Sequence, residues 1–162
     1  VFGIPLFGTG IALEHNGKVV VSVINLPCFK EMYTAEKGKG AFLNGKKINV
    51  SSRKENYMIT FSGIWNIDDK FVKKQFNKLV QKFRHNFRVP GSAVVQLAWV
   101  ACGKVDGSLM LSLKPWDIGP ALLVEEAGGV VTDLKGKDWN SYMGSYIVAN
   151  NRLHKAILKV CN

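Results

Sequence analysis

Acidic residues, paired cysteines and long apolar runs are all scarce in this sequence, and each shortage excludes a class of protein. No apolar run approaches the ~20 residues that a membrane-spanning helix needs, and no basic and apolar leader marks the chain for export. The three cysteines, Cys28, Cys102 and Cys161, lie far apart and form no C-x-x-C unit. We therefore expect a cytoplasmic protein with reduced thiols and no membrane partner.

Basic residues outnumber acidic ones. The 162 residues include 22 Lys+Arg and 12 Asp+Glu, which gives a formal net charge of +10. Such an excess indicates a nucleic acid, a small anionic substrate or an acidic part of the protein elsewhere. The lysines and arginines are scattered, and aromatic residues do not interleave with them. This pattern favours a solvated surface over a groove for a polyanion, so a nucleic acid is the less favoured partner.

Two Asn-Gly dipeptides, Asn16-Gly17 and Asn44-Gly45, divide the first fifty residues. Asn-Gly between apolar runs is the strongest short signal for a β-hairpin. The runs predicted as strands are 9–15, 19–26, 31–36 and 42–43. The sequence therefore predicts an antiparallel meander, and we assign residues 1–56 to the antiparallel sheet layer of one domain.

From Tyr57 onward, predicted strands alternate with predicted helices. The strands are 57–62, 86–89, 105–111, 130–132 and 146–149. The helix signals are Asp68-Asp69 before the amphipathic run 71–83, Ser92 as the cap of a helix to Gly103, Asp117 opening a helix closed by Gly128-Gly129, and Asn151 capping a last helix. This order predicts a mostly parallel or mixed sheet covered by helices. Residues 57–162 would form an α/β subdomain behind the first sheet, in a layered α/β fold.

Gly91, Ser92 and Ala93 stand where a short strand gives way to a helix. The free N–H groups of a helix start favour anions and hydroxyl oxygens, so these residues are candidates for binding a substrate. The alternative is simple capping, with the glycine allowing a tight turn.

Asp117 is a single carboxylate at a strand-to-helix turn, preceded by Trp116. As a cap it would accept hydrogen bonds from the first helical turn. As a hard oxygen ligand it would suit Mg²⁺, and the carboxyl end of a strand is where α/β proteins bind ligands. The spacing alone leaves both interpretations open.

The chain offers no side chain for nucleophilic catalysis. None of its serines lies in a G-x-S-x-G elbow, and no histidine stands in a recognisable triad setting. Glu126 lies at the end of a predicted helix, where an acid opposes the helix dipole, so we expect it to accept structural hydrogen bonds. We predict no catalytic residue within this chain.

Together these motifs resemble the inositol monophosphatase family, a Mg²⁺-dependent, lithium-sensitive superfamily that includes fructose-1,6-bisphosphatases. The run WDIGPA at 116–121, followed by EAGG at 126–129, is similar to the two-part signature of that family. Supporting similarities are GIP at 3–5, MYTA at 32–35, GKGAFLNG at 38–45, GSA at 91–93, VDG at 105–107 and ANN at 149–151.

The resemblance implies the C-terminal part of an α-β-α-β-α sandwich that hydrolyses a phosphate monoester with Mg²⁺. It implies that Asp117 is a metal ligand that also contacts a substrate hydroxyl. Gly91, Ser92 and Ala93 would bind the sugar or inositol ring. The expected partners are a small anionic sugar or inositol phosphate and, in the full-length protein, a second copy in a homodimer.

Two departures from the family pattern carry further expectations. The family's D-P-x-D-G-T metal motif is not in this chain, so we expect the chain alone to be inactive. Met110 stands where inositol-specific members carry a substrate-binding glutamate. We therefore keep fructose-1,6-bisphosphate as an alternative substrate. A non-catalytic module that binds RNA or a transcription complex is the alternative from another class.

Overall fold

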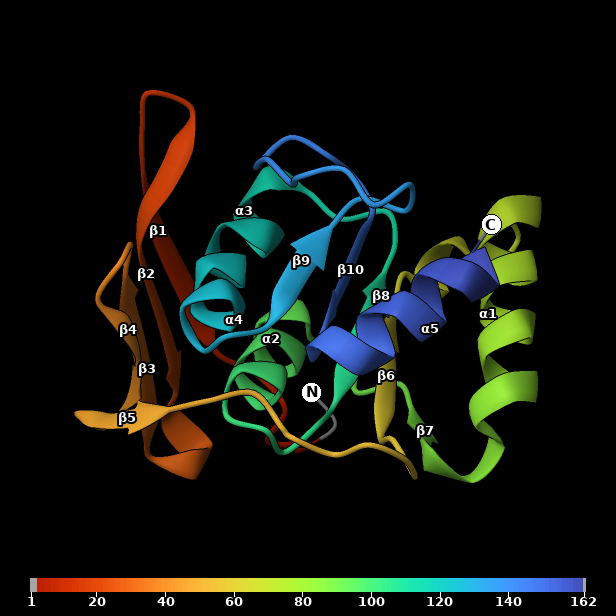
Figure 1. Ribbon diagram of the computed structural model, residues 1–162, viewed down its shortest axis with the longest axis horizontal. Helices are drawn as coiled ribbons and strands as arrows, with labels where there is room; N and C mark the ends of the chain where they lie inside the picture. The colour runs from red at the N-terminus through yellow and green to blue at the C-terminus, as the bar shows by residue number, and fades with distance from the viewer. Residues whose placement is uncertain (1–2, 162) are drawn as a thin grey trace.

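The computed structural model describes residues 3–161, apart from the side chains of Ile64 and His85. Its elements form four successive layers (Figure 1). An antiparallel sheet is followed by a layer of inner helices, a mixed sheet and a layer of outer helices. The layered α/β arrangement predicted from the sequence is confirmed.

The first sheet is an antiparallel meander in the strand order β1-β2-β3-β4-β5. Its strands are β1 Thr9–His15, β2 Lys18–Leu26, β3 Glu31–Glu36, β4 Gly40–Leu43 and β5 Lys46–Ile48. Both Asn-Gly pairs adopt left-handed backbone angles, with φ of 50° and 72° at Asn16 and Gly17 and of 49° and 77° at Asn44 and Gly45. Such angles suit the tight turns of two-residue hairpins, as the sequence predicts.

The second sheet is mixed, in the order β7-β6-β8-β10-β9. Its strands are β6 Ile59–Ser62, β7 Phe87–Arg88, β8 Gly107–Met110, β9 Val130–Thr132 and β10 Tyr146–Ala149. Strand β6 runs parallel to β7 and β8, whereas β10 is antiparallel to β8 and β9. The predicted order of strands and helices after Tyr57 is therefore confirmed.

The outer helices are α1 Lys70–Phe83 and α5 Asn151–Cys161, which pack together over the second sheet. Asp69 caps α1 as predicted, accepting hydrogen bonds from the backbone N–H groups of Phe71 and Val72 at 2.8 and 3.0 Å. The predicted cap of α5 was wrong by one residue. Asn150, not Asn151, accepts the hydrogen bond from the N–H of Leu153, at 2.9 Å. Helix ends read from sequence shift by a residue easily when two similar residues adjoin.

The segment after Asp117 is not the single helix that the sequence predicts. It forms α3 Pro115–Ile118, a 3-10 turn Gly119–Ala121 and α4 Leu122–Glu126. Pro120 explains the break, because it has no N–H to donate to the carbonyl of Trp116. Asp117 also does not open α3 but lies at its third position.

Two hydrophobic clusters lie on opposite faces of the second sheet. The cluster between the sheets contains Tyr33, Leu97 and Tyr146, all with no exposed surface. The cluster beneath α1 and α5 contains Phe61 and Leu153, which are equally buried. Across the described residues, no helix combines the length and the apolar character that crossing a membrane requires.

The linker between the sheets is held by Asp106, whose side chain is fully buried. Its Oδ2 accepts hydrogen bonds from the backbone N–H of Met58 at 2.7 Å and from Nη1 of Arg53 at 2.9 Å. Its Oδ1 accepts a hydrogen bond from Ser51, and Ser51 Oγ accepts one from Nδ2 of Asn150 at 3.1 Å. One carboxylate thus joins the linker to the loop before β8 and to the start of α5.

We expect His154 to make the stability of the fold dependent on pH. Its side chain is buried, with Nε2 2.8 Å from Oγ1 of Thr132, and burial lowers its pKa below the ordinary value of 6.5. The unfolded chain therefore takes up a proton near pH 6.5 while the folded imidazole is still neutral, so the free energy of unfolding falls as the pH drops below about 6.5. Urea denaturation at about pH 7.5 and at about pH 5.5 measures the free energy of unfolding at each pH. Between these two pH values, the free energy should fall more in the wild type than in His154→Gln. Equal losses would contradict this.

Candidate active site

Asp117 is anchored at the start of α3 by one of its two oxygens. Its Oδ2 accepts a hydrogen bond from the backbone N–H of Lys114 at 3.0 Å. The carboxylate is half-buried, and its Oδ1 accepts no hydrogen bond within residues 3–161. Both interpretations of this acid therefore fit the geometry, because one oxygen caps the helix and the other remains able to bind a ligand.

A groove of about 490 Å³ lies between β1 and the segment that carries Asp117. Its wall includes Trp116, which is 73% exposed, and Tyr142, which is 75% exposed. The turn after Asp117 packs closely on the first sheet, since a Cβ at Gly119 would lie 2.6 Å from Cβ of Ala12. The hydroxyl of Ser22 also donates to the carbonyl of Gly119 at 2.9 Å. The first sheet thus fixes the position of the Trp-Asp turn.

Gly91, Ser92 and Ala93 lie at the start of α2 Ala93–Ala101. Gly91 is exposed with φ of 80°, in the left-handed region that glycine tolerates best. Ser92 occupies the N-cap position that the sequence predicts, but its side chain makes no capping hydrogen bond. With no side-chain cap on the first turn of α2, its N–H groups stay available to an outside oxygen.

Gly10 of β1 brings the start of α2 close to the turn that follows α3. A Cβ at this position would lie 2.9 Å from Cγ1 of Val94 and 3.0 Å from Cγ of Pro120. The start of α2 and the turn after α3 therefore pack on the same point of β1. No hydrogen bond links Asp117 directly to Ser92 among the residues that the structure describes.

The described residues do not form a complete metal site. Within them, no group of three or more His, Cys, Asp or Glu side chains converges in a way that could hold a metal ion. Asp117 offers one carboxylate oxygen, whereas Mg²⁺ prefers near-ideal octahedral coordination by oxygens. The described part of the chain therefore fits Mg²⁺ only as the source of a single ligand.

Met110 and Glu126 are two other positions that the sequence analysis singled out. Met110 is fully buried in the core between the sheets. Glu126 accepts hydrogen bonds from the N–H groups of Gly38 and Gly40, both at 2.8 Å, which confirms its predicted structural role.

Sequence reasoning missed the adjacent Glu125, whose Oε1 accepts a hydrogen bond from Nε1 of Trp139 at 2.7 Å. No local pattern marks that contact, because its partners lie on separate segments.

Over residues 1–162 the sequence matches the inositol monophosphatase family. It is 34% identical over 165 residues to a fructose-1,6-bisphosphatase/inositol-1-monophosphatase of Thermotoga maritima, covering 100% of this chain and 62% of the relative. It is 35% identical over 159 residues to the Nus factor SuhB of Escherichia coli, covering 96% of this chain and 60% of the relative. The chain thus spans about three fifths of the length of these relatives.

Solved structures agree with the observed layers. An inositol monophosphatase from Anabaena superposes with a TM-score of 0.89 at 30% identity, over 96% of this chain and 64% of that one. The extragenic suppressor protein SuhB of Bartonella henselae gives a TM-score of 0.89 at 32% identity, over 99% of this chain and 63% of that one. Sequence and fold lead to one conclusion: the chain belongs to the inositol monophosphatase family.

Proposed function

We propose that the whole protein hydrolyses a phosphate monoester of a sugar or an inositol with Mg²⁺, and that this chain supplies one metal ligand and part of the substrate-binding wall. The family is one of phosphatases that generally use Mg²⁺. The observation that carries the proposal is the half-buried Asp117, which is held by Oδ2 while Oδ1 has no hydrogen-bond partner among residues 3–161, close to the start of α2, which has no side-chain cap.

In this proposal the residues of the chain bind and orient the substrate. Asp117 offers Oδ1 to a metal ion and to a substrate hydroxyl, while Gly91, Ser92 and Ala93 bind ring oxygens through N–H groups and the serine hydroxyl. When bound, Mg²⁺ would supply a Lewis acid for the phosphoryl group. The remaining metal ligands would come from polypeptide outside this chain, so we expect the chain alone to be inactive.

The domain organisation in this proposal is one phosphatase domain with two structural parts, residues 1–56 and residues 57–162. The two sheets support the division, because β5 ends at Ile48 and β6 begins at Ile59. We further propose that the full-length protein forms a homodimer.

Met110 lacks the carboxylate that would favour an inositol phosphate, so fructose-1,6-bisphosphate is the alternative substrate of this proposal. A thioether in the core cannot accept a strong hydrogen bond from a ring hydroxyl, as a glutamate could. The relative from Thermotoga maritima carries both activities in its name. On this alternative, we expect full-length protein to release phosphate from fructose-1,6-bisphosphate with a higher kcat/KM than from inositol-1-phosphate. A clear preference for inositol-1-phosphate would contradict this.

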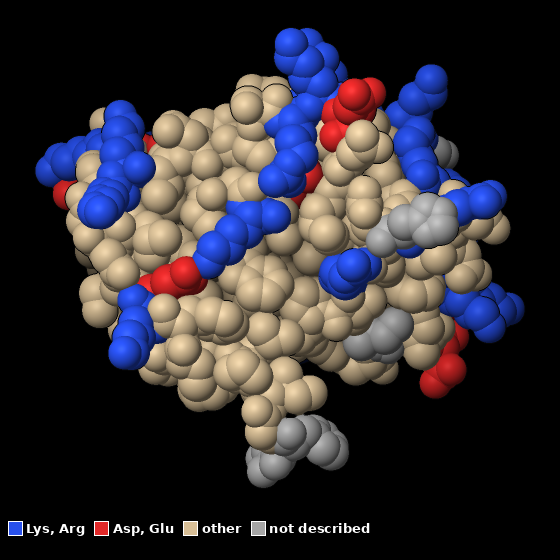
Figure 2. Space-filling model, turned by 90° about the horizontal axis from the view of Figure 1, so that it is seen from below, with Lys and Arg blue, Asp and Glu red and all other residues tan. Residues whose placement is uncertain are grey.

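A second candidate function is binding within a transcription complex. The observations that favour it are the net charge of +10 and the relatives named Nus factor SuhB. Figure 2 shows lysine and arginine side chains at many places on the face in view, several of them in a diagonal row that acidic side chains interrupt. RNA affinity that falls steeply with salt would distinguish this function from phosphatase activity alone.

A further inference from the structure

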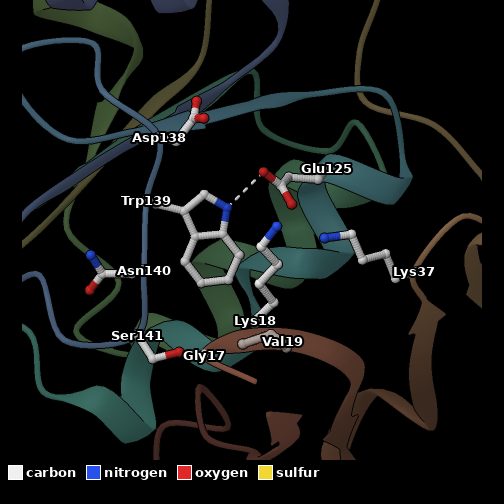
Figure 3. A pocket seen from close by; sticks show the side chains of 9 residues that line it. All are labelled: Gly17, Lys18, Val19, Lys37, Glu125, Asp138, Trp139, Asn140 and Ser141. Carbon is white, nitrogen blue, oxygen red and sulfur yellow. Dashed lines mark hydrogen bonds between the residues drawn. The ribbon is translucent and has the colours of Figure 1, made fainter. Parts of the chain in front are cut away.

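A second pocket lies on the side of α4 that faces the hairpin between β1 and β2 (Figure 3). Its volume is about 200 Å³. The lining residues are Gly17, Lys18, Val19, Lys37, Glu125, Asp138, Trp139, Asn140 and Ser141. We call it the Lys18–Lys37 pocket. None of these residues belongs to the set predicted to bind substrate or metal, so the phosphatase proposal leaves the pocket unexplained.

Two ammonium groups converge in this pocket. Figure 3 shows the side chains of Lys18 and Lys37 pointing toward the same space beside Glu125 and the ring of Trp139. Within the described part of the chain, neither lysine has an acidic partner within 4.0 Å. The carboxylate of Asp138 points away from that space in the same view. The lining therefore contains two lysines and two acidic residues, and of these the two ammonium groups and the Glu125 carboxylate face the same space.

Ser141 is a further polar residue of the lining. Its side chain is only 9% exposed, it lines the pocket, and its hydroxyl makes no hydrogen bond among the described residues. In Figure 3 the hydroxyl lies beside Gly17, at the opposite end of the Trp139 ring from the nitrogens of Lys18 and Lys37.

The walls of the pocket are held in place by neighbouring contacts. Glu126 binds the N–H groups of Gly38 and Gly40 at 2.8 Å, which fixes the turn that carries Lys37 against the end of α4. Trp139 is tied to the same helix by its 2.7 Å hydrogen bond to Glu125. A preorganised site loses less entropy on binding than a mobile one.

Glu125 is the group that an entering anion would meet. Partial burial raises the pKa of Glu125, as do the nearby Glu126 and Asp138, while the Trp139 hydrogen bond and Lys37 act in the opposite direction. The Glu125 carboxylate therefore competes with any anion that binds between the two lysines. Removal of its charge should strengthen anion binding.

We propose that the Lys18–Lys37 pocket binds a small oxyanion, a carboxylate or a phosphate group, between the ammonium groups of Lys18 and Lys37. Charge-assisted hydrogen bonds of this kind are short and strong. A volume of about 200 Å³ admits a group of this size and excludes a polymer. This site is independent of the proposed phosphatase function.

The test is an NMR titration of ¹⁵N-labelled full-length protein with sodium malonate and, separately, with inorganic phosphate, in EDTA and at constant ionic strength. EDTA removes any contribution from a metal-dependent site. The indole N–H of Trp139 reports locally, and its signal is assigned by its loss in Trp139→Phe. A saturable shift with both probes, or with only one, supports the site and identifies the preferred group.

The variants are expected to change the affinity for the anion in opposite directions. Lys18→Gln and Lys37→Gln should each weaken binding about tenfold, whereas Lys18→Arg and Lys37→Arg should retain it and Glu125→Gln should strengthen it several-fold. Lys155→Gln removes the same charge from the exposed face of α5 and should leave the affinity unchanged. The proposal is overturned if no shift saturates, or if Lys18→Gln, Lys37→Gln and Lys155→Gln all bind as the wild type does.

Discussion

Asp117→Asn in the full-length protein should reduce metal-dependent phosphate release by about a thousandfold. A metal ion contributes several kcal/mol to phosphoryl transfer, and each 1.4 kcal/mol is about tenfold in rate, so loss of ~4 kcal/mol corresponds to that factor. Asparagine still offers an oxygen to the N–H of Lys114, so the start of α3 and the melting temperature should change little. The measurement is phosphate release as a function of Mg²⁺ concentration.

The matched control for this variant is Asp68→Asn, which removes the same charge from an exposed position before α1. Its turnover should equal that of the wild type. If Asp117→Asn kept its activity within about tenfold, Asp117 would be a helix cap only, and its role as a metal ligand would have to be abandoned.

The second large effect concerns stability. Asp106→Ala should lower the free energy of unfolding by about 3 kcal/mol, because it leaves the N–H of Met58, the hydroxyl of Ser51 and the guanidinium of Arg53 without their acceptor. Donors that lose their partner at a buried site cost about 1–3 kcal/mol each when they cannot reach water. Urea denaturation measures the change.

Arg53→Ala is the control that separates the ion pair from the neutral hydrogen bonds. The side chain of Arg53 is 47% exposed, so its contribution to the pair is screened by water. This variant should cost about 1 kcal/mol or less, since Asp106 keeps Met58 and Ser51 as donors. If the two variants were equally destabilising, the ion pair and not the backbone contact would hold the linker.

Much of the first sheet is predictable from sequence because its signals are local. The Asn-Gly turns at 16–17 and 44–45 need left-handed backbone angles that few other dipeptides adopt readily, and they place the flanking strands side by side. In residues 57–162 the order of strands and helices is predictable from the sequence, but the ends of the helices are less so. Pro120 splits the predicted third helix, and Asn150 rather than Asn151 caps α5. Both outcomes depend on single hydrogen bonds that apolar periodicity does not report.

The site is predictable only in part. Asp117 and the start of α2 are marked by motifs, and the fold brings their helical segments together at Gly10, as far as this chain extends. The Lys18–Lys37 pocket has no such mark. Its walls come from the β1–β2 hairpin, the β3–β4 turn, the end of α4 and the loop between β9 and β10, so only the folded chain places them next to one another.

The central claim is that the carboxylate of Asp117 is a metal ligand. Anomalous diffraction from crystals of the full-length protein soaked with Mn²⁺, used in place of Mg²⁺, tests it most directly. We predict a metal peak within about 2.5 Å of Oδ1 of Asp117, close to the short oxygen–metal distances of such sites. A metal bound elsewhere, or no bound metal while Asp117 keeps only its hydrogen bond from Lys114, would contradict the claim.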